Sequence, residues 1–169
     1  MADPPSPFIE TWIARHRPRA GTLARALDVA MGRGRHAALL ADAGYQTFGV
    51  DLAIDALCEA RASVPRLHVW CADLASYPLP RAHFDLVVVA RYLQRDLFGA
   101  LQDAIVPGGV MLYETFTIHQ RQLGRGPTSA DHLLQPGELR ARFDGFDVLA
   151  YEEVSGPDAV ARLAARKRP

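Results

Sequence analysis

Two glycines, Gly32 and Gly34, stand between an apolar segment and an alanine- and leucine-rich segment of this 169-residue chain. Glycine lets the backbone approach a ligand closely, and the start of a helix offers free N–H groups and a partial positive charge. A strand at residues 26–30, a turn through the glycines and a helix at residues 35–43 would therefore suit a nucleotide-like ligand. The spacing Gly32-x-Gly34-x-x-Ala37 also fits the dinucleotide-binding fingerprint, so the turn alone leaves both kinds of ligand open.

Two carboxylates narrow the choice. Asp51 ends a second predicted strand at residues 46–51, and Asp73 follows a third at residues 67–71. Because the carboxyl ends of parallel strands meet at one edge of a sheet, Asp51 would lie beside the glycine turn and accept both hydroxyl groups of a ribose. Asp73, one strand further along, could accept the exocyclic amino group of an adenine. Taken singly, Asp51 could instead cap the helix that follows it, and Asp73 could hold a turn.

The elements that must position these residues alternate between strand and helix, which predicts an α/β fold with a mostly parallel sheet covered on both faces. The apolar run at 84–90 is typical of a central strand. Residues 117–135 have no clean period and are expected to form a functional flap. The remaining predicted strands are 110–116, 146–154 and 159–166, and the remaining predicted helices are 8–24, one from residue 54 to Pro65, 93–105 and 136–143.

Composition predicts one soluble domain over residues 8–169, preceded by a disordered lead at residues 1–7. The chain is 49% hydrophobic and has a formal net charge of zero, so nonspecific binding to nucleic acid or acidic lipid is not expected. We also expect no membrane span and no secretory signal, which predicts a cytoplasmic protein. Cys58 and Cys71 form no disulfide scaffold and are expected to be buried apolar residues. One chain does not predict the oligomeric state.

Four motifs in order resemble those of the class I S-adenosylmethionine-dependent methyltransferases, especially small bacterial enzymes of the tellurite-resistance-like group. The resemblance covers about residues 22–166. The motifs are Leu27-Asp28-Val29-Ala30-Met31-Gly32-Arg33-Gly34, Gly49-Val50-Asp51-Leu52, Cys71-Ala72-Asp73-Leu74 and Phe84-Asp85-Leu86-Val87-Val88-Val89. The resemblance implies a Rossmann-like, doubly wound sheet of seven strands, mostly parallel with the last strand antiparallel. It also implies S-adenosylmethionine as cofactor and S-adenosylhomocysteine as product.

By similarity, the family's cofactor contacts fall on residues of these motifs, and Ala90 would close the floor of the site after the fourth strand. The matched residues are Asp28, Ala30, Gly32 and Gly34 in the first motif, of which the two glycines line the methionine part, then Asp51 at the ribose, Leu52 against the adenine, and Asp73 with Leu74 at the adenine edge. Ala30 stands where the family usually has the first glycine of the turn, so its methyl group narrows the mouth of the pocket.

A dinucleotide-binding enzyme is the alternative reading of the glycine turn. Such an enzyme needs a pocket for a second nucleotide half and usually a substrate domain, for which 169 residues leave little room. In a dinucleotide-binding enzyme, Asp28 and Asp73 would have no assigned role. The sequence therefore favours methyl transfer, an in-line displacement in which the protein positions two partners and excludes water.

Candidates for the acceptor side follow the fourth and fifth strands. Our hypothesis is that Arg91 and Arg95 present positive charge to an anionic acceptor, while Tyr92 and Glu114 shape or polarise the pocket. His36, in the first turn of the helix after the glycines, could accept a proton. In the simpler alternative, the arginines are solvated at the start of a helix, Tyr92 packs, and His36 fills space.

The acceptor is expected to be a small molecule with a thiol, chalcogen, amine or hydroxyl acceptor atom. A protein or RNA acceptor, an NAD-type protein and a cofactor-binding protein without turnover remain open alternatives. No metal is expected, because the spacing of His119, His132 and Glu114 matches no zinc signature.

Overall fold

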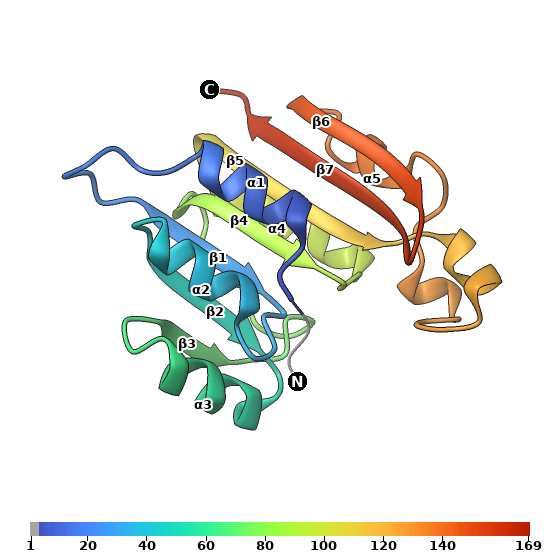
Figure 1. Ribbon diagram of the computed structural model, residues 1–169. Coiled ribbons are helices and arrows are strands. Elements are labelled where there is room, and N and C mark those ends of the chain that lie inside the picture. The colour runs from blue at the N-terminus through green and yellow to red at the C-terminus, as the bar shows by residue number, and fades with distance from the viewer. Residues whose placement is uncertain (1–3) are drawn as a thin grey trace.

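Seven strands form one sheet across residues 4–169, the part of the chain that the computed structural model describes (Figure 1). They are β1 (Arg25–Val29), β2 (Gln46–Asp51), β3 (His68–Cys71), β4 (Phe84–Ala90), β5 (Ile105–Phe116), β6 (Phe146–Ser155) and β7 (Ala159–Lys167). Their order across the sheet is β3-β2-β1-β4-β5-β7-β6, with β7 antiparallel to both of its neighbours. This order confirms the predicted doubly wound fold with an antiparallel last strand.

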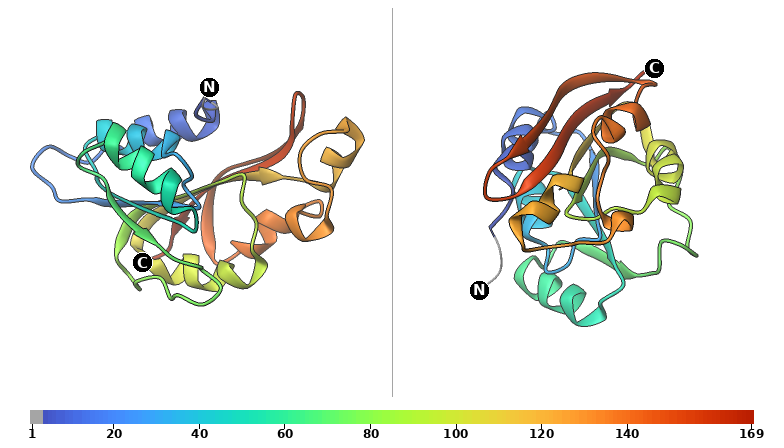
Figure 2. Two further views of the ribbon diagram at one scale, coloured as in Figure 1. Left: turned by 90° about the horizontal axis from the view of Figure 1, so that it is seen from below. Right: turned by 90° about the vertical axis from the view of Figure 1, so that its right-hand side faces the viewer.

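Helices cover both faces of this sheet, as Figure 2 shows in its left-hand view. They are α1 (Pro7–Arg15), α2 (Arg35–Asp42), α3 (Ile54–Ser63), α4 (Phe98–Ala104) and α5 (Glu138–Arg142), with short 3-10 turns η1 (Arg95–Leu97), η2 (Ile118–Leu123) and η3 (Ala130–His132). The first three helices lie on one face, and α4 and α5 lie on the other. No helix within residues 4–169 is long and apolar enough to cross a lipid bilayer.

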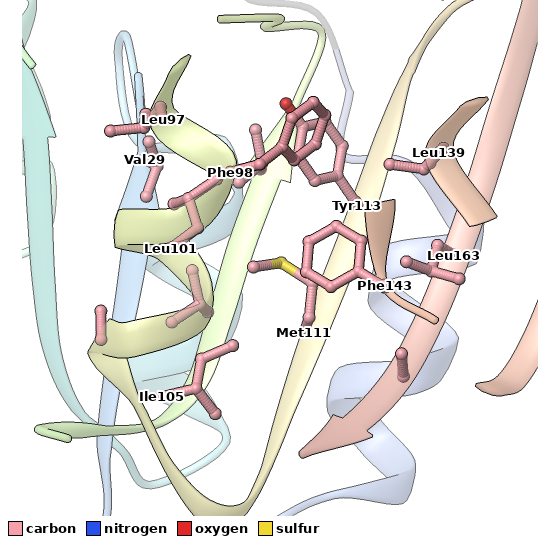
Figure 3. Close-up of a cluster of buried hydrophobic side chains, with 14 of the residues drawn as sticks. Val29, Leu97, Phe98, Leu101, Ile105, Met111, Tyr113, Leu139, Phe143 and Leu163 are labelled. Atoms are coloured by element: carbon pink, nitrogen blue, oxygen red, sulfur yellow. The ribbon is translucent and has the colours of Figure 1, made fainter. Parts of the chain in front are cut away.

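The central strand β4 is apolar throughout because both of its faces are covered. Side chains alternate between the faces of a strand: Val87 and Val89 pack in the cluster under α4 and α5, whereas Leu86 and Val88 pack in the cluster under α1 and α2. Figure 3 shows part of the first cluster, in which side chains from α4, β5, α5 and β7 meet. Because β1 and β4 pair in parallel, their carboxyl ends lie side by side.

Helix α1 begins at Pro7, inside the segment expected to be a disordered lead. Ser6 is its N-cap, and the Ser6 hydroxyl accepts the N–H of Ile9 at 3.4 Å. Proline is preordered for the first helical turn, which explains this start. The helix ends after nine residues, well short of the predicted helix 8–24. Residues 1–3 of the expected lead lie outside the described residues.

Both cysteines are exposed, so the expectation that they are buried apolar residues is wrong. Cys58 lies on α3, which turns Leu57 and Ala60 toward the core instead. Cys71 ends β3, one of the two edge strands of the sheet, where fewer neighbours cover a side chain.

The helix predicted at 93–105 is shorter: the 3-10 turn η1 precedes α4, which ends at Ala104, where β5 follows directly. The flap expected at 117–135 contains η2 and η3, and the bridge between Thr117 and Leu134 closes it.

Candidate active site

The turn between β1 and α2 bends through left-handed backbone at Ala30, Gly32 and Gly34, with φ of 51°, 53° and 77°. A Cβ added to Gly32 would meet no atom within 4 Å, so open space faces this part of the turn. At Gly34, in contrast, an added Cβ would lie 3.0 Å from atoms of Ala60 and Met31. Gly32 thus leaves room for a ligand, whereas Gly34 allows α2 to pack closely against α3.

Ala30 adopts a conformation that costs a non-glycine residue about 1–2 kcal/mol. Arg91, at the end of the adjacent strand β4, is also left-handed, with φ of 56°. Such strain persists only where surrounding structure holds it, and it gathers at functional sites. Here it marks the carboxyl ends of β1 and β4, the point where the strand order reverses and ligands of open α/β sheets bind.

Asp51 is tied directly to the glycine turn. Its Oδ2 accepts the N–H of Gly32 at 2.7 Å, and its Oδ1 accepts the N–H of Ala53 at 2.9 Å, at the start of α3. A carboxylate has about four lone-pair sites, so two hydrogen bonds leave acceptor capacity on both oxygens. The carboxylate therefore shapes the turn and remains able to accept hydroxyl groups.

Asp73 lies in the turn after β3. Its Oδ1 accepts the N–H of Ala75 at 2.9 Å, which orders the turn and leaves the carboxylate exposed. Leu52 is 69% exposed, and Leu74 packs partly against the core. An apolar side chain left this open at a sheet edge is suited to cover the face of a planar ligand.

Tyr92 links the end of β4 to this edge. Burial, followed by the negative charges of Asp73, Asp96 and Asp51, raises the pKa of its phenol, so the hydroxyl group stays protonated. The Tyr92 hydroxyl donates to Gln94. The Tyr92 phenol is therefore close enough to be affected by the charges of Asp51 and Asp73, the two carboxylates that the sequence analysis assigns to the cofactor.

Asp28 is buried at the centre of the site, with 1% of its surface exposed. Burial raises its pKa to about 7, against the lowering effects of the Ala37 N–H and the charge of Arg35. Among residues 4–169, no group hydrogen-bonds to its Oδ2. An unsatisfied buried oxygen is costly, and it is suited to face a cation.

His36 is engaged rather than free. Its Nε2 accepts the backbone N–H of Ser6 at 3.0 Å. Burial, followed by the charges of Arg35 and Arg91, lowers its pKa to about 4. The ring is therefore neutral near pH 7, and the nitrogen that could accept a proton already holds the N-terminal segment.

Glu114, near the end of β5, is 7% exposed and continues the same chain of hydrogen bonds. Its Oε2 accepts the Ser6 hydroxyl at 2.9 Å and the Arg162 Nε–H at 2.6 Å. Ser6 thus joins α2 to β5 and β7 through His36 and Glu114. Sequence reasoning missed Ser6 and Arg162, because Ser6 falls in the segment expected to be a disordered lead and its partners lie far away in the sequence.

Arg91 points along the end of the sheet, where its guanidinium donates to Asp158 Oδ2 at 3.1 Å and lies 5.8 Å from the Phe116 ring. Arg95 is differently placed, with its guanidinium held by groups of α5 and of the flap. It is bidentate to Glu138 at 2.7 and 2.9 Å and donates to flap carbonyls, including that of Leu133 at 2.8 Å. Arg95 therefore holds the flap against α5.

A cavity of about 400 Å³ opens beside these groups. The N-terminal segment 4–7 and the turn between β6 and β7 form its walls, and Arg35, Arg91, Arg162 and Glu114 line it. A volume of this order is typical of small-molecule sites. Ala90 is partly buried at the end of β4, next to Arg91.

Residues 26–109 match the family described as "Methyltransferase domain". The chain is 31% identical over 115 residues to a probable S-adenosylmethionine-dependent methyltransferase of Mycolicibacterium smegmatis, and 34% identical over 103 residues to a malonyl-[acyl-carrier protein] O-methyltransferase of Enterobacter lignolyticus. These matches cover 62% and 57% of this chain but only 45% and 40% of the relatives, so the chain spans less than half the length of either.

Among solved structures, an S-adenosylmethionine-dependent methyltransferase from Mesorhizobium loti has the same fold. The TM-score is 0.73 at 21% identity, over 94% of this chain and 98% of that one.

Proposed function

We propose that this chain is a class I S-adenosylmethionine-dependent methyltransferase and that it transfers a methyl group from S-adenosylmethionine to a small-molecule acceptor. The observation that carries the proposal is the Asp51 carboxylate on the N–H of Gly32, at the point where the strand order reverses. At this point, open space beside the glycine turn adjoins a carboxylate that can still accept hydrogen bonds.

The residues present fit this cofactor. Asp51 would accept the ribose hydroxyls, and Asp73 would accept the adenine amino group, with Leu52 and Leu74 beside the ring. Gly32 would leave room for the methionine part, near the buried Oδ2 of Asp28. When bound, the cofactor supplies an electrophilic methyl group on a positively charged sulfur.

The charges of the chain's own residues support the same assignment. Asp28, Asp51 and Asp73 gather negative charge around the turn, which favours a cationic ligand. Ionisation of Asp28 near pH 7 would be favoured further by a cation at its unsatisfied oxygen. The partly buried phenol of Tyr92, at the end of β4, would help to exclude water from the side of the turn that faces the acceptor.

We propose that the acceptor binds in the 400 Å³ cavity beside Arg91. Asp158 holds the Arg91 guanidinium toward this cavity, and its planar fork can share donors with an anionic group of the acceptor. Tyr92 would form part of the wall on the cofactor side. His36 and Glu114 would act as positioning residues, because their polar atoms hold Ser6 and thereby the wall made by residues 4–7.

The test is release of S-adenosylhomocysteine with a panel of thiol, chalcogen, amine, hydroxyl and carboxylate acceptors. We expect turnover with at least one of them. Arg91→Ala should lower kcat/KM for that acceptor by about tenfold or more, the loss of one charge-assisted contact, with affinity for S-adenosylhomocysteine retained. Arg81→Ala, an exposed arginine paired with Asp103, is the matched control.

Equal kcat/KM in the Arg91→Ala protein would remove Arg91 from the acceptor site. Binding of the cofactor without turnover on any small acceptor would leave the protein or RNA acceptor and the non-catalytic alternative. Tight binding of NAD would favour the dinucleotide alternative.

A further inference from the structure

A second pocket, of about 610 Å³, lies at the opposite end of the sheet from the glycine turn. We call it the amino-edge pocket. The loop after α1 (residues 16–19), the starts of the strands around Tyr45 and Asp85, the turn 106–110 and Arg166 near the end of β7 form its lining. Because the proposed methyl-transfer site lies at the carboxyl ends of β1 and β4, this pocket is separate from it.

The lining of the amino-edge pocket is strongly positive. Arg17, Arg19 and Arg166 reach it from two segments far apart in the sequence, and Asp85 is the one acidic residue among the described lining residues. The Asp85 Oδ2 accepts the backbone N–H of Arg25 at 2.8 Å. Three guanidinium groups against one carboxylate leave two positive charges in excess, in a chain whose net charge is zero.

His16 also lines the pocket, with its Nδ1 3.0 Å from the carbonyl of Trp12 and its Nε2 3.4 Å from the Arg166 guanidinium. Across residues 4–169, no carboxylate pairs with the guanidinium of Arg17 or Arg19.

The loop that carries Arg17 and Arg19 is held in place. The Tyr45 hydroxyl donates to the carbonyl of His16, and burial raises the pKa of Tyr45 to about 12, so this donor keeps its proton. The carbonyl of Arg19 accepts both the N–H and the hydroxyl of Thr22, at 3.0 and 2.6 Å. A pinned loop spends less conformational entropy on binding than a free one.

The opposite wall is also fixed. A Cβ on Gly109 would lie 3.0 Å from the carbonyl oxygen of Asp85 and 2.7 Å from the Ile105 side chain, so the turn packs tightly on β4. The pocket is therefore bounded on one side by packed backbone and on the other by the arginine loop.

We propose that the amino-edge pocket binds the phosphate monoester group of a small ligand. A phosphate monoester carries close to two negative charges at neutral pH, which match the two charges in excess, and guanidinium forks match its oxygens. A carboxylate, with one charge, would leave positive charge uncompensated. This second site serves recognition of a phosphorylated compound and does not depend on methyl transfer.

The test is calorimetric titration of the full chain with phenyl phosphate at low ionic strength, because salt screens exposed charges. We expect phenyl phosphate to bind saturably and inorganic phosphate to displace it. Benzoate should bind with much lower affinity. The double variant Arg17→Gln/Arg19→Gln should weaken phenyl phosphate binding by roughly tenfold, since two partly screened contacts are lost. Arg15→Gln, at the end of α1 and outside the pocket lining, should bind like the wild type.

Three kinds of result would overturn the proposal. No saturable binding, or equal affinity in the double variant, would show that these arginines do not form a site. Binding of a 12-nucleotide RNA that phenyl phosphate fails to displace would assign the arginines to nucleic acid instead. The same titrations with S-adenosylhomocysteine present separate this site from the proposed methyl-transfer site, because phenyl phosphate should then bind unchanged. If S-adenosylhomocysteine competes with phenyl phosphate, the two ligands share one site and the proposal of a separate pocket fails.

Discussion

The buried carboxyl group of Asp28 should make the stability of this fold depend on pH in a way that one substitution removes. Asp28 lies in β1 with 1% of its surface exposed, and its Oδ2 has no partner among the described residues. Asparagine has nearly the same shape and cannot ionise. Asp28→Asn therefore deletes the charge while keeping the volume.

The magnitude follows from the pKa of Asp28, which burial raises from 3.8 to about 7. An acid with a higher pKa in the folded state stabilises that state through its proton. This contribution is complete below pH 3.8 and is lost as the pH rises through about 7. The full loss is roughly 4 kcal/mol, at 1.36 kcal/mol per pKa unit, and roughly 2–3 kcal/mol of it falls between pH 5 and pH 8.

Urea denaturation at pH 5 and pH 8 measures this loss. Between these pH values, the free energy of unfolding of the wild type should fall by roughly 2–3 kcal/mol more than that of Asp28→Asn. Asp42→Asn, an exposed acid on α2, is the matched control and should behave like the wild type. If the wild type and Asp28→Asn change in parallel, to within about 0.5 kcal/mol, Asp28 is ionised at both pH values and the account of its burial fails.

Three further substitutions test the supports of the site. Gly34→Ala, at φ 77°, should lower the free energy of unfolding by about 1–2 kcal/mol in urea denaturation, and an unchanged midpoint would contradict the packing argument. Arg95→Lys keeps the charge but loses the fork on Glu138 and the flap carbonyls; proteolysis within the flap should accelerate while cofactor affinity is retained, and equal cleavage rates would speak against this role. Ser6→Ala removes the hydroxyl that donates to Glu114 and should cost about 1 kcal/mol of stability. It should also raise the KM for the acceptor more than the Kd for the cofactor; equal effects on both would argue against a wall role for the N-terminal segment.

The sheet and its glycine turn could be predicted because their signals are local. The apolar run of β4 and the Ala30–Gly34 turn each lie within a few residues. Parallel strands end at one edge, and this rule alone puts Asp51 near the turn. The hydrogen bond from Gly32 to Asp51 is the detail that only the structure supplies.

The acceptor side could not be predicted, because its contacts join residues far apart in the sequence. Ser6 bonds to Glu114 across 108 positions, and Arg95 bonds to Glu138 across 43. No local pattern distinguishes an arginine that holds a flap from one that faces a ligand. The exposure of Cys71 was missed for a similar reason, since the strand order that makes β3 an edge strand is a property of the whole sheet.

The central claim is that one adenosine-containing sulfonium binds where Asp51 meets the glycine turn, and calorimetric titration tests it most directly. Wild-type protein should bind S-adenosylmethionine and S-adenosylhomocysteine with one site per chain and give no saturable heat with NAD. Asp51→Ala should weaken both by roughly 30-fold or more, the loss of charge-assisted contacts to the ribose. Asp55→Ala, an exposed acid in the first turn of α3, should bind like the wild type. Equal affinity in folded Asp51→Ala protein, or displacement of the cofactor by NAD, would contradict the claim.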